Sequence, residues 1–192
     1  ISLEAPYKIS DLVVACANVL GVSLIGDYTT GPFAWEYEIG ANYIGDETIL
    51  DVLVDIAEAT NTIYYLDREE RLTFKVLDIE GAAVTTLTKE DYITLSSKTN
   101  RRLTNIAHVT ELGEDFTSGT GVSGSTQYIR DNPFLDMLDG TEVAARVNAM
   151  VERICGLTIN QFNCSWRGNY LIEIGDKIGL ITKDGETTTS YL

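Results

Sequence analysis

Apolar residues recur with helical spacing in three segments, near residues 9–20, 48–60 and 141–155. Apolar positions separated by three and four residues lie on one face of an α-helix, and that face packs against a core. We expect Ser10 to cap the first helix and Thr141 to cap the third, because a hydroxyl oxygen can accept a free amide hydrogen of the first turn. The pattern therefore predicts three amphipathic helices.

The ends of two of these helices carry further signals. Thr48 and Asp51 have the spacing of a capping box, in which each side chain accepts a hydrogen bond from the other residue's amide. Gly21 follows the first helix, where glycine adopts a left-handed backbone without a steric penalty. Asp55 and Glu58 fall outside the apolar stripe of the second helix, so we expect them to face water beside Asp51.

Short runs of apolar and alternating residues predict the strands of the first part of the chain. Val22–Ile25 is a short apolar run, and Trp35–Ile39 alternates large apolar residues with glutamates. Thr62–Leu66 and Arg71–Leu77 predict a β-hairpin, since the charged segment 67–70 between them is typical of a turn. Two helices packed on a small sheet form an α+β unit.

The second part of the chain is richer in predicted strands. They are expected at Asn105–Leu112, Tyr128–Arg130, Thr158–Trp166, Tyr170–Glu173, Lys177–Thr182 and Thr187–Leu192, with a short edge strand and a turn within Thr85–Thr94. Lys183–Glu186 contains Asp-Gly, which favours a type I′ hairpin turn. Gly113–Gln127 is rich in glycine, serine and threonine, so we expect an exposed and mobile loop there.

Two turns lie close together near the end of the chain. Gly168-Asn169 and Gly175-Asp176 both favour a reversal in which glycine takes a positive φ. We expect Ala to fit poorly at Gly175. We also expect the Trp166 side chain to pack into the core of the second part.

These patterns predict an α+β fold with two units. The first, residues 1–80, is a small two-helix α+β unit. The second, residues 81–192, is a β-rich unit that forms a partial barrel, with helix 141–155 inserted. The chain starts at Ile1 and stops within an expected strand. We therefore expect it to be a piece of a longer polypeptide, truncated at its C-terminus.

Charge and cysteine content narrow the partners and the compartment. The net charge of −15, from 29 acidic and 14 basic residues, repels phosphate backbones and anionic lipid heads. We therefore expect no stable nucleic-acid binding, and no apolar run is long enough for membrane insertion. Cys16, Cys155 and Cys164 are widely spaced and odd in number, which indicates free, buried thiols in a protein made in a reducing cytoplasm.

Gly119, Gly121 and Gly124 match the glycine spacing of dinucleotide-binding proteins. That chemistry requires the glycines between a buried strand and a helix whose N-terminus faces the pyrophosphate. Here Pro133 interrupts any long helix soon after the glycines, and no strand–helix–strand unit surrounds them. The glycines therefore indicate a loop, and we expect no cofactor.

His108 is the only histidine of the chain, which limits the available metal and catalytic chemistry. Metal sites with two or three histidines are impossible, and no close cysteine pair supplies thiolates. A Ser/His/Asp triad would need His108 as its base, but the sequence has no Gly-x-Ser-x-Gly nucleophile elbow. We assign no catalytic, cofactor-binding or metal-binding residues, and expect His108 to be a packed or strand-edge residue.

Acidic and aromatic residues leave other function classes open. A glycosidase needs two carboxyl groups about 5–10 Å apart in a cleft, one of them desolvated, and counting acids does not exclude such a pair. Aromatic residues cluster in the first part, but Tyr64 and Tyr65 lie on opposite faces of their strand, so one of them is expected in the core. The alternatives are a carbohydrate- or protein-binding surface module and an acidic hydrolase fragment.

Three short segments in the second part occur in a recognisable order. Asn132–Leu135 (Asn-Pro-Phe-Leu) precedes the third helix, Trp166–Asn169 (Trp-Arg-Gly-Asn) ends a strand, and Gly175-Asp176 follows shortly after. This order resembles the tail-hub, or baseplate hub, proteins of long-tailed bacteriophages and prophages. The resemblance covers residues 100–192, and residues 1–79 are compatible with the α/β domain that precedes this region in the family.

The resemblance implies a structural protein and not an enzyme. In the tail-hub family a similar segment closes a β-barrel in a trimeric ring, which connects the tail tube to the tail tip. The implied partners are two further copies of the full-length protein and other tail proteins, namely the distal tail and tape-measure proteins. The implied location is the virion tail, after synthesis in the bacterial cytoplasm.

Overall fold

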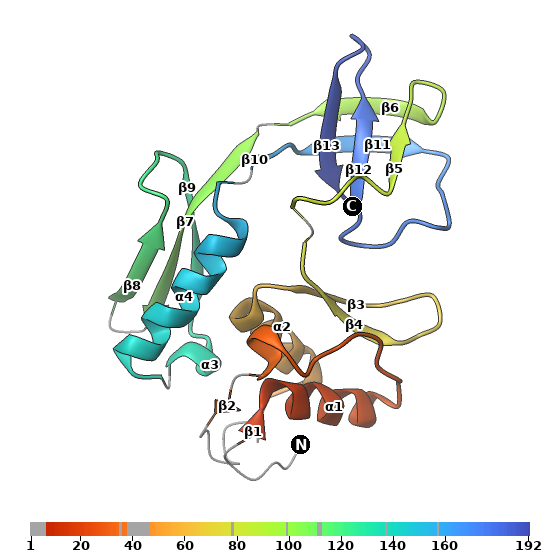
Figure 1. Ribbon diagram of the computed structural model, residues 1–192. Coiled ribbons are helices and arrows are strands. Elements are labelled where there is room, and N and C mark those ends of the chain that lie inside the picture. Colours follow the sequence, from red (N-terminus) through yellow and green to blue (C-terminus); the bar gives the residue numbers. More distant parts are fainter. Residues whose placement is uncertain are drawn as a thin grey trace.

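The computed structural model of the chain has an α+β fold in which helices and several small sheets surround three clusters of buried side chains (Figure 1). The structure describes residues 7–34, 36–37, 47–77, 79–98, 100–110, 113–136, 138–156 and 158–192. The α+β class predicted from the sequence is confirmed. The division into units at residues 80 and 81 stays a prediction, which the three clusters neither support nor oppose.

The N-terminal elements surround the first core. They are β1 (Tyr7–Lys8), α1 (Ile9–Leu20), the 3-10 helix η1 (Gly31–Ala34), β2 (Glu36–Tyr37), α2 (Ile49–Thr60), β3 (Ile63–Leu66) and β4 (Leu72–Lys75). The two helices pack against each other, and β3 and β4 form the predicted antiparallel hairpin. Buried side chains of both helices and of β4 make the first core, as the helical stripes predicted.

The ends of helices α1 and α2 agree with the predictions except at the start of α1. Thr48 and Asp51 form the predicted capping box, and Gly21 has the predicted positive φ of 71°. The prediction of Ser10 as the first cap was wrong, because the helix already begins at Ile9. Lys8 is the extended residue before it, and its amide donates to a carboxylate oxygen of Asp11 at 2.9 Å.

Two strand predictions in this region have a different outcome. Val22–Ile25 does not form a strand and makes only an isolated bridge between Leu24 and Leu72. In the predicted strand Trp35–Ile39, Glu36 and Tyr37 form β2, which pairs with β1. The rest of that predicted strand lies outside the described residues.

The second core lies between a sheet and a long helix. The elements are β7 (Arg101–Thr110), β8 (Gly113–Gly119), β9 (Ser125–Arg130), α3 (Pro133–Asp136), α4 (Gly140–Ile154) and β10 (Thr158–Ile159). β8 pairs antiparallel and β9 parallel with the same stretch of β7, so they occupy its two edges. Helix α4 packs on β7 and β8, and its predicted apolar stripe is buried (Figure 1).

The helix α4 is capped by Asp139 and not by the predicted Thr141. The side chain of Asp139 accepts hydrogen bonds from the amides of Thr141 and Glu142 at 2.8 and 2.9 Å. Both residues fit a cap by composition, and the helix starts one residue earlier than the sequence pattern indicated.

The predicted mobile loop Gly113–Gln127 was wrong over most of its length, because it forms β8 and the start of β9. The glycines serve a crossing of the chain over the beginning of β7. A Cβ at Gly119 would lie 2.8 Å from the Thr104 carbonyl oxygen, and a Cβ at Gly124 would lie 2.6 Å from the Thr104 hydroxyl oxygen. Close packing therefore accounts for Gly119 and Gly124, while Gly121 has open space around it and a positive φ of 73°.

The third core belongs to a barrel-like unit, a name used here for strands β5, β6, β11, β12 and β13 with the segment 167–176. The strands are β5 (Thr85–Leu87), β6 (Tyr92–Ser97), β11 (Phe162–Trp166), β12 (Lys177–Ile181) and β13 (Thr187–Tyr191). They form a three-stranded sheet, β13-β12-β5, and a two-stranded sheet, β11-β6, without closing a barrel. The partly buried Trp166 packs against the third core, as predicted.

Three local predictions in this unit were wrong. Tyr170–Glu173 is not a strand but part of the connecting segment 167–176. The predicted strand Thr158–Trp166 is interrupted at residues 160–161, where the chain passes from β10 to β11. The turn between β12 and β13 is not type I′, because only Gly185 has a positive φ there, of 89°.

Candidate functional site

The segments that carried the sequence resemblance lie where parts of the molecule distant in sequence meet. Asn132–Leu135 contacts helix α2 and joins the first and second cores. Residues 172–176, which include Gly175-Asp176, contact the β3–β4 hairpin. We name these contacts the Asn–Pro–Phe junction and the Gly–Asp junction. They join elements that are distant in the sequence, and together they form the candidate functional site.

The Asn–Pro–Phe junction is buried and combines one amide with two apolar side chains. Asn132 is fully buried, and its Nδ2 donates to the backbone oxygen of Asp55 at 3.0 Å and to Glu58 Oε2 at 3.4 Å. Phe134 is 1% exposed and belongs to the first core, while Leu135 belongs to the second. Two consecutive side chains thus anchor the same short helix in two cores.

Arg153 of α4 strengthens this junction from the other end of α2. Its guanidinium donates to the backbone oxygens of Thr60 and Asn61 at 2.5 and 3.3 Å. These carbonyls lie at the C-terminus of α2, where they lack intrahelical partners and carry partial negative charge. Burial lowers the pKa of Arg153, and the two carbonyl oxygens supply hydrogen bonds that a buried guanidinium requires.

Acidic groups gather at the same junction. The pKa of Asp55 is raised to about 7, first by burial and then by the charges of Glu47, Glu58, Asp51 and Asp136. The expectation that Asp55 and Glu58 face water was wrong, because α3 covers this side of α2 and leaves both partly buried.

His108 lies on β7 and is buried, as the sequence predicted for a packed residue. Its Nε2 lies 2.7 Å from Asp136 Oδ1, so an ion pair or hydrogen bond ties β7 to α3. The histidine thus supports the second core beside the junction. No group of three or more potential metal-ligating residues occurs in the part of the chain that the structure describes.

The Gly–Asp junction depends on a close backbone approach. Gly175 has a φ of 78°, and a Cβ added there would overlap the end of the Ile63 side chain and lie 3.2 Å from Lys75 Cδ. Positive φ and lack of space both disfavour any larger residue. The prediction that Ala fits poorly at Gly175 is confirmed in both respects.

Polar contacts complete the Gly–Asp junction. The Lys75 ammonium forms an ion pair with Asp176, and Arg68 donates to the Ile172 carbonyl oxygen at 2.8 Å. The Tyr65 hydroxyl donates to Glu173 Oε2 at 3.3 Å, where burial and the Glu173 charge raise its pKa to about 12. Hydrogen bonds from the Glu173 amide and from Lys75 outweigh burial and lower the pKa of Asp176.

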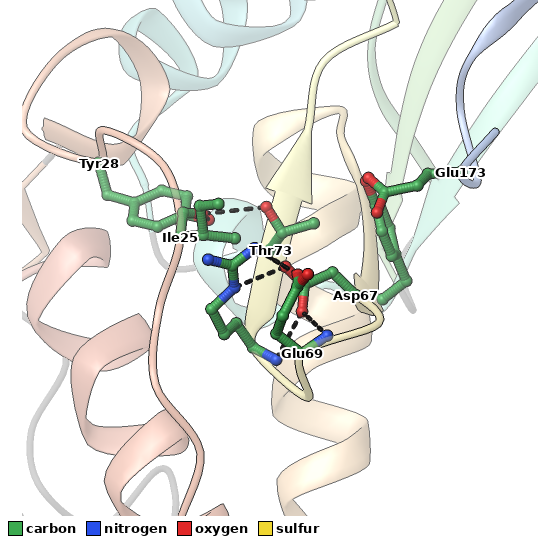
Figure 2. Close-up of polar contacts among 8 residues, drawn as sticks. Ile25, Tyr28, Asp67, Glu69, Thr73 and Glu173 are labelled. Atoms are coloured by element: carbon green, nitrogen blue, oxygen red, sulfur yellow. Dashed lines mark hydrogen bonds and ion pairs between the residues drawn. The ribbon is translucent and has the colours of Figure 1, made fainter. Parts of the chain in front are cut away.

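The hairpin that carries these donors has its own polar framework. Figure 2 shows Asp67 and Glu69 at its turn and Glu173 on the neighbouring segment. Asp67 accepts from the amides of Glu69 and Arg71 and from Arg71 Nε, at 3.0, 2.8 and 2.7 Å. The Ile25 carbonyl oxygen accepts from Thr73 at 3.0 Å, which ties β4 to the loop after α1. The turn therefore holds Arg68 in place for the junction.

The outer side of segment 167–176 exposes apolar groups. Tyr170 and Leu171 are 79% and 64% exposed, and Ile174 and the nearby Leu66 of β3 are about half exposed. The Arg68 guanidinium lies 5.9 Å from the Tyr170 ring centroid, a cation–π geometry that orients the ring. Exposed apolar groups gathered on one segment are typical of a protein–protein contact.

The three cysteines, which are possible nucleophiles by residue type, lie on or next to helices and strands of the fold. Cys16 is buried in α1, Cys155 lies just after α4, and Cys164 lies on β11, all with free thiols. Burial raises the thiol pKa of each, and that of Cys16 reaches about 11. The prediction of buried thiols is confirmed for Cys16, whereas Cys155 and Cys164 are only partly buried. A thiol with a raised pKa is a poor nucleophile.

Tyr64 and Tyr65 point to different surroundings, as their alternation predicted. Tyr64 packs against Phe74, with ring centroids 5.8 Å apart, while Tyr65 is used in the Gly–Asp junction. Trp35, the other aromatic of interest, lies outside the described residues. No pattern in the sequence indicated the roles of Arg153 and Asp55, because both depend on contacts with elements about 80 or more residues away.

The comparisons with known proteins place this fold among phage tail proteins of known structure. A tail protein from Neisseria meningitidis MC58 superimposes on this chain with a TM-score of 0.56 and 14% sequence identity. The match covers all of this chain and 62% of the Neisseria protein. The 43 kDa tail protein of prophage MuSo2 from Shewanella oneidensis superimposes with a TM-score of 0.53 and 12% sequence identity. That match covers 96% of this chain and 56% of the prophage protein.

The other two comparisons returned nothing: no protein-family model and no curated protein matches the chain. At such low identities the structural similarity establishes a shared fold. The chain spans about three fifths of the length of these two tail proteins. No helix among the described residues is long and apolar enough to span a membrane.

Proposed function

We propose that this chain is a structural part of a phage or prophage tail, and that the full-length protein forms the hub ring between tail tube and tail tip. The carrying observation is the similarity of nearly the entire chain to two phage tail proteins. The sequence resemblance independently led to the same kind of protein. A subunit of such a ring acts through its contacts and not through turnover.

The construction of the site supports a structural role. Both junctions use their polar groups to hold elements together, through Asn132, Arg153 and Arg68. Asp55 has the raised pKa of a carboxylic acid in a desolvated site, but its surroundings are an internal contact between α2 and α3. Its role is therefore better explained by packing than by acid catalysis.

A ring requires every subunit to present two different, complementary faces. The apolar residues Tyr170, Leu171 and Ile174 are candidates for one such face, because they are exposed on a segment that also contacts the β3–β4 hairpin. The partners in this proposal are two further copies of the full-length protein, with the distal tail and tape-measure proteins above and below. The acidic charge of the chain suits a passage through which DNA moves without binding.

The test is the mass of the full-length protein in solution. Light scattering coupled to gel filtration should give the mass of a trimer, and binding to duplex DNA at physiological salt should be absent. A stable monomer with glycosidase or nuclease turnover contradicts the proposal. A trimer that binds DNA strongly keeps the structural role but contradicts the passage for DNA.

A further inference from the structure

We propose that the barrel-like unit is a hinged body and that the polar contacts of the Gly–Asp junction form a latch, which holds it in one of two positions. Closed, the segment 172–176 lies against the β3–β4 hairpin, as seen here. Open, the unit turns away as an intact body, and its exposed Tyr170 and Leu171 move with it. This inference concerns the motion of the chain itself and is independent of the proposed function.

The first argument is the separation of the cores. The first and second cores are continuous, because Leu138 packs against both and Phe134 of α3 lies in the first. Among the described residues, the third core shares no member with either of them. A body with its own core can move without exposing that core to water, so its rotation costs little hydrophobic burial.

The second argument is a narrow double connection, which is suited to serve as the hinge. Only a short stretch separates β6 from β7, with Lys98 and Asn100 as its described residues, and β10 runs on into β11 through residues 160–161. The two links lie side by side, since the Lys98 amide donates to the Gln161 carbonyl oxygen at 2.7 Å. Lys98, Asn100 and Gln161 are exposed. Asn160 donates to Thr188 of β13 at 2.9 Å and so belongs to the barrel-like unit, which places the turning point of this link between β10 and Asn160. Figure 1 shows the links as a narrow connection between the two bodies.

The remaining connection is the segment between β4 and β5. Lys177 of β12 donates to the carbonyl oxygens of Ile79 and Gly81 at 2.7 and 2.8 Å. These bonds attach the backbone of the segment to the barrel-like unit, while the Ile79 side chain packs against the second core. The residues of this connection that are described form no helix or strand, and they can follow a rotation of the unit.

The third argument is the chemistry of the latch. Its contacts are the Lys75–Asp176 ion pair, the Arg68 bond to the Ile172 carbonyl oxygen and the Tyr65 bond to Glu173. All three join partly buried groups, which water can solvate when the contact opens. Such contacts are modest in strength and are weakened by salt. Opening a polar contact of this kind costs little free energy, whereas opening an apolar core contact costs the burial of its whole apolar area.

The experiment compares a latch variant with a matched control by small-angle X-ray scattering and hydrogen exchange. The latch variant is Arg68→Met with Lys75→Met, which removes both cations of the hairpin side. The control is Lys89→Met with Lys183→Met, which removes the same charge from exposed turns of the barrel-like unit. The latch variant should have a larger radius of gyration than both the control and the unchanged chain.

Hydrogen exchange separates rotation from unfolding. The amides of Gly179 and Leu180 lie in the middle of β12 between two partner strands, and they should stay protected in the latch variant. Raising the salt concentration should shift the unchanged chain toward the larger radius, because ion pairs are screened. An unchanged radius in the latch variant overturns the proposal, and so does loss of protection in β12, since the unit would then unfold instead of turning.

Discussion

The two junctions of the N-terminal elements differ in what holds them together. At the Asn–Pro–Phe junction, Phe134 and Leu135 are buried in two neighbouring cores, and the polar groups are enclosed. At the Gly–Asp junction, a close backbone approach at Gly175 is surrounded by partly exposed charges. Burial of apolar area gives a large and permanent stabilisation, whereas polar contacts near water give a small one.

In the motion proposed above, one chain combines a fixed part with an adjustable part. The first and second cores act as a single body, because separating α3 from the first core would expose the large apolar side chain of Phe134. The barrel-like unit is held to that body by contacts that water and salt can replace. The following predictions test the comparison, in order of decreasing effect on stability.

Phe134→Ala should give the largest loss. Truncating a fully buried aromatic side chain leaves a cavity and costs about 3–5 kcal/mol of unfolding free energy. Chemical denaturation of the variant measures this loss. Tyr170→Ala is the matched control, because that aromatic is mostly exposed. Equal effects of the two substitutions would contradict the difference between the buried junction and the exposed segment.

Asn132→Ala should cause the next largest loss of stability. The substitution leaves the Asp55 carbonyl oxygen and the Phe134 amide without the bonds that Asn132 supplies. The Asp55 carbonyl oxygen keeps its partner within helix α2, so the loss is that of the hydrogen bonds themselves, about 1 kcal/mol each. Denaturation in urea measures the change, with Asn169→Ala, a turn residue of the barrel-like unit, as comparison. If Asn132→Ala is as stable as the unchanged chain, the hydrogen bonds of Asn132 do not help to hold this junction together.

Gly175→Ala should destabilise by about 1–3 kcal/mol, because a positive φ is strained for alanine. Part of the cost arises from overlap with the end of the Ile63 side chain. Combining it with Ile63→Val, which removes the overlapping methyl group, should therefore recover part of the loss. Thermal melting of the two single variants and the double variant measures the recovery. Strictly additive effects would mean that the close approach is not tight.

Because of Asp55, the unfolding free energy of the chain should be higher at acidic pH than at alkaline pH. Its pKa of about 7 in the folded chain lies above the ordinary value near 4 of an unfolded chain. The folded state therefore binds more protons between these values, and stability falls as pH rises from about 4 to 7. Asp55→Asn should flatten this slope and stabilise the chain at pH 8 by about 1 kcal/mol, a figure that allows for solvent screening.

Melting temperatures at pH 5 and pH 8 measure the effect of Asp55. Asp184→Asn provides the control, because that aspartate lies in the exposed β12–β13 turn. If Asp55→Asn leaves the pH slope unchanged, the acidic groups at the Asn–Pro–Phe junction are more exposed to water than the structure indicates.

Replacing Tyr170 by Ser should have the smallest effect on stability, within about 0.5 kcal/mol, because the side chain is exposed. The same variant of the full-length protein should assemble less well, since a contact between subunits loses an apolar group. Comparing melting with the mass in solution separates the two effects. Normal assembly of the variant would exclude Tyr170 from the ring contact.

The helices and the β3–β4 hairpin were predictable because their signals are local. Capping at Thr48 and apolar spacing within α2 do not depend on the rest of the chain. The segment 113–127 was mispredicted because its composition is that of a loop, while its pairing with β7 supplies backbone partners that composition does not reveal. Tertiary contacts override local propensity in such strands.

The candidate site was predictable only through the resemblance. Asn132–Leu135 and Gly175-Asp176 stood out as short segments, but their contacts with α2 and with β4 arise from folding. Arg153 has no local signal at all, since its partners are carbonyl oxygens at the end of a helix whose last residue, Thr60, lies 93 residues earlier in the chain. Roles of this kind become visible when the elements are brought together in space.

The most direct test of the proposed role is electron cryo-microscopy of the tail from the phage or prophage that encodes this chain. The account predicts a ring of three copies at the tip of the tail tube, with density for the first, second and third cores in each copy. The segment with Tyr170 and Leu171 should face a neighbouring subunit. A tail tip that contains no copy of this fold would contradict the account.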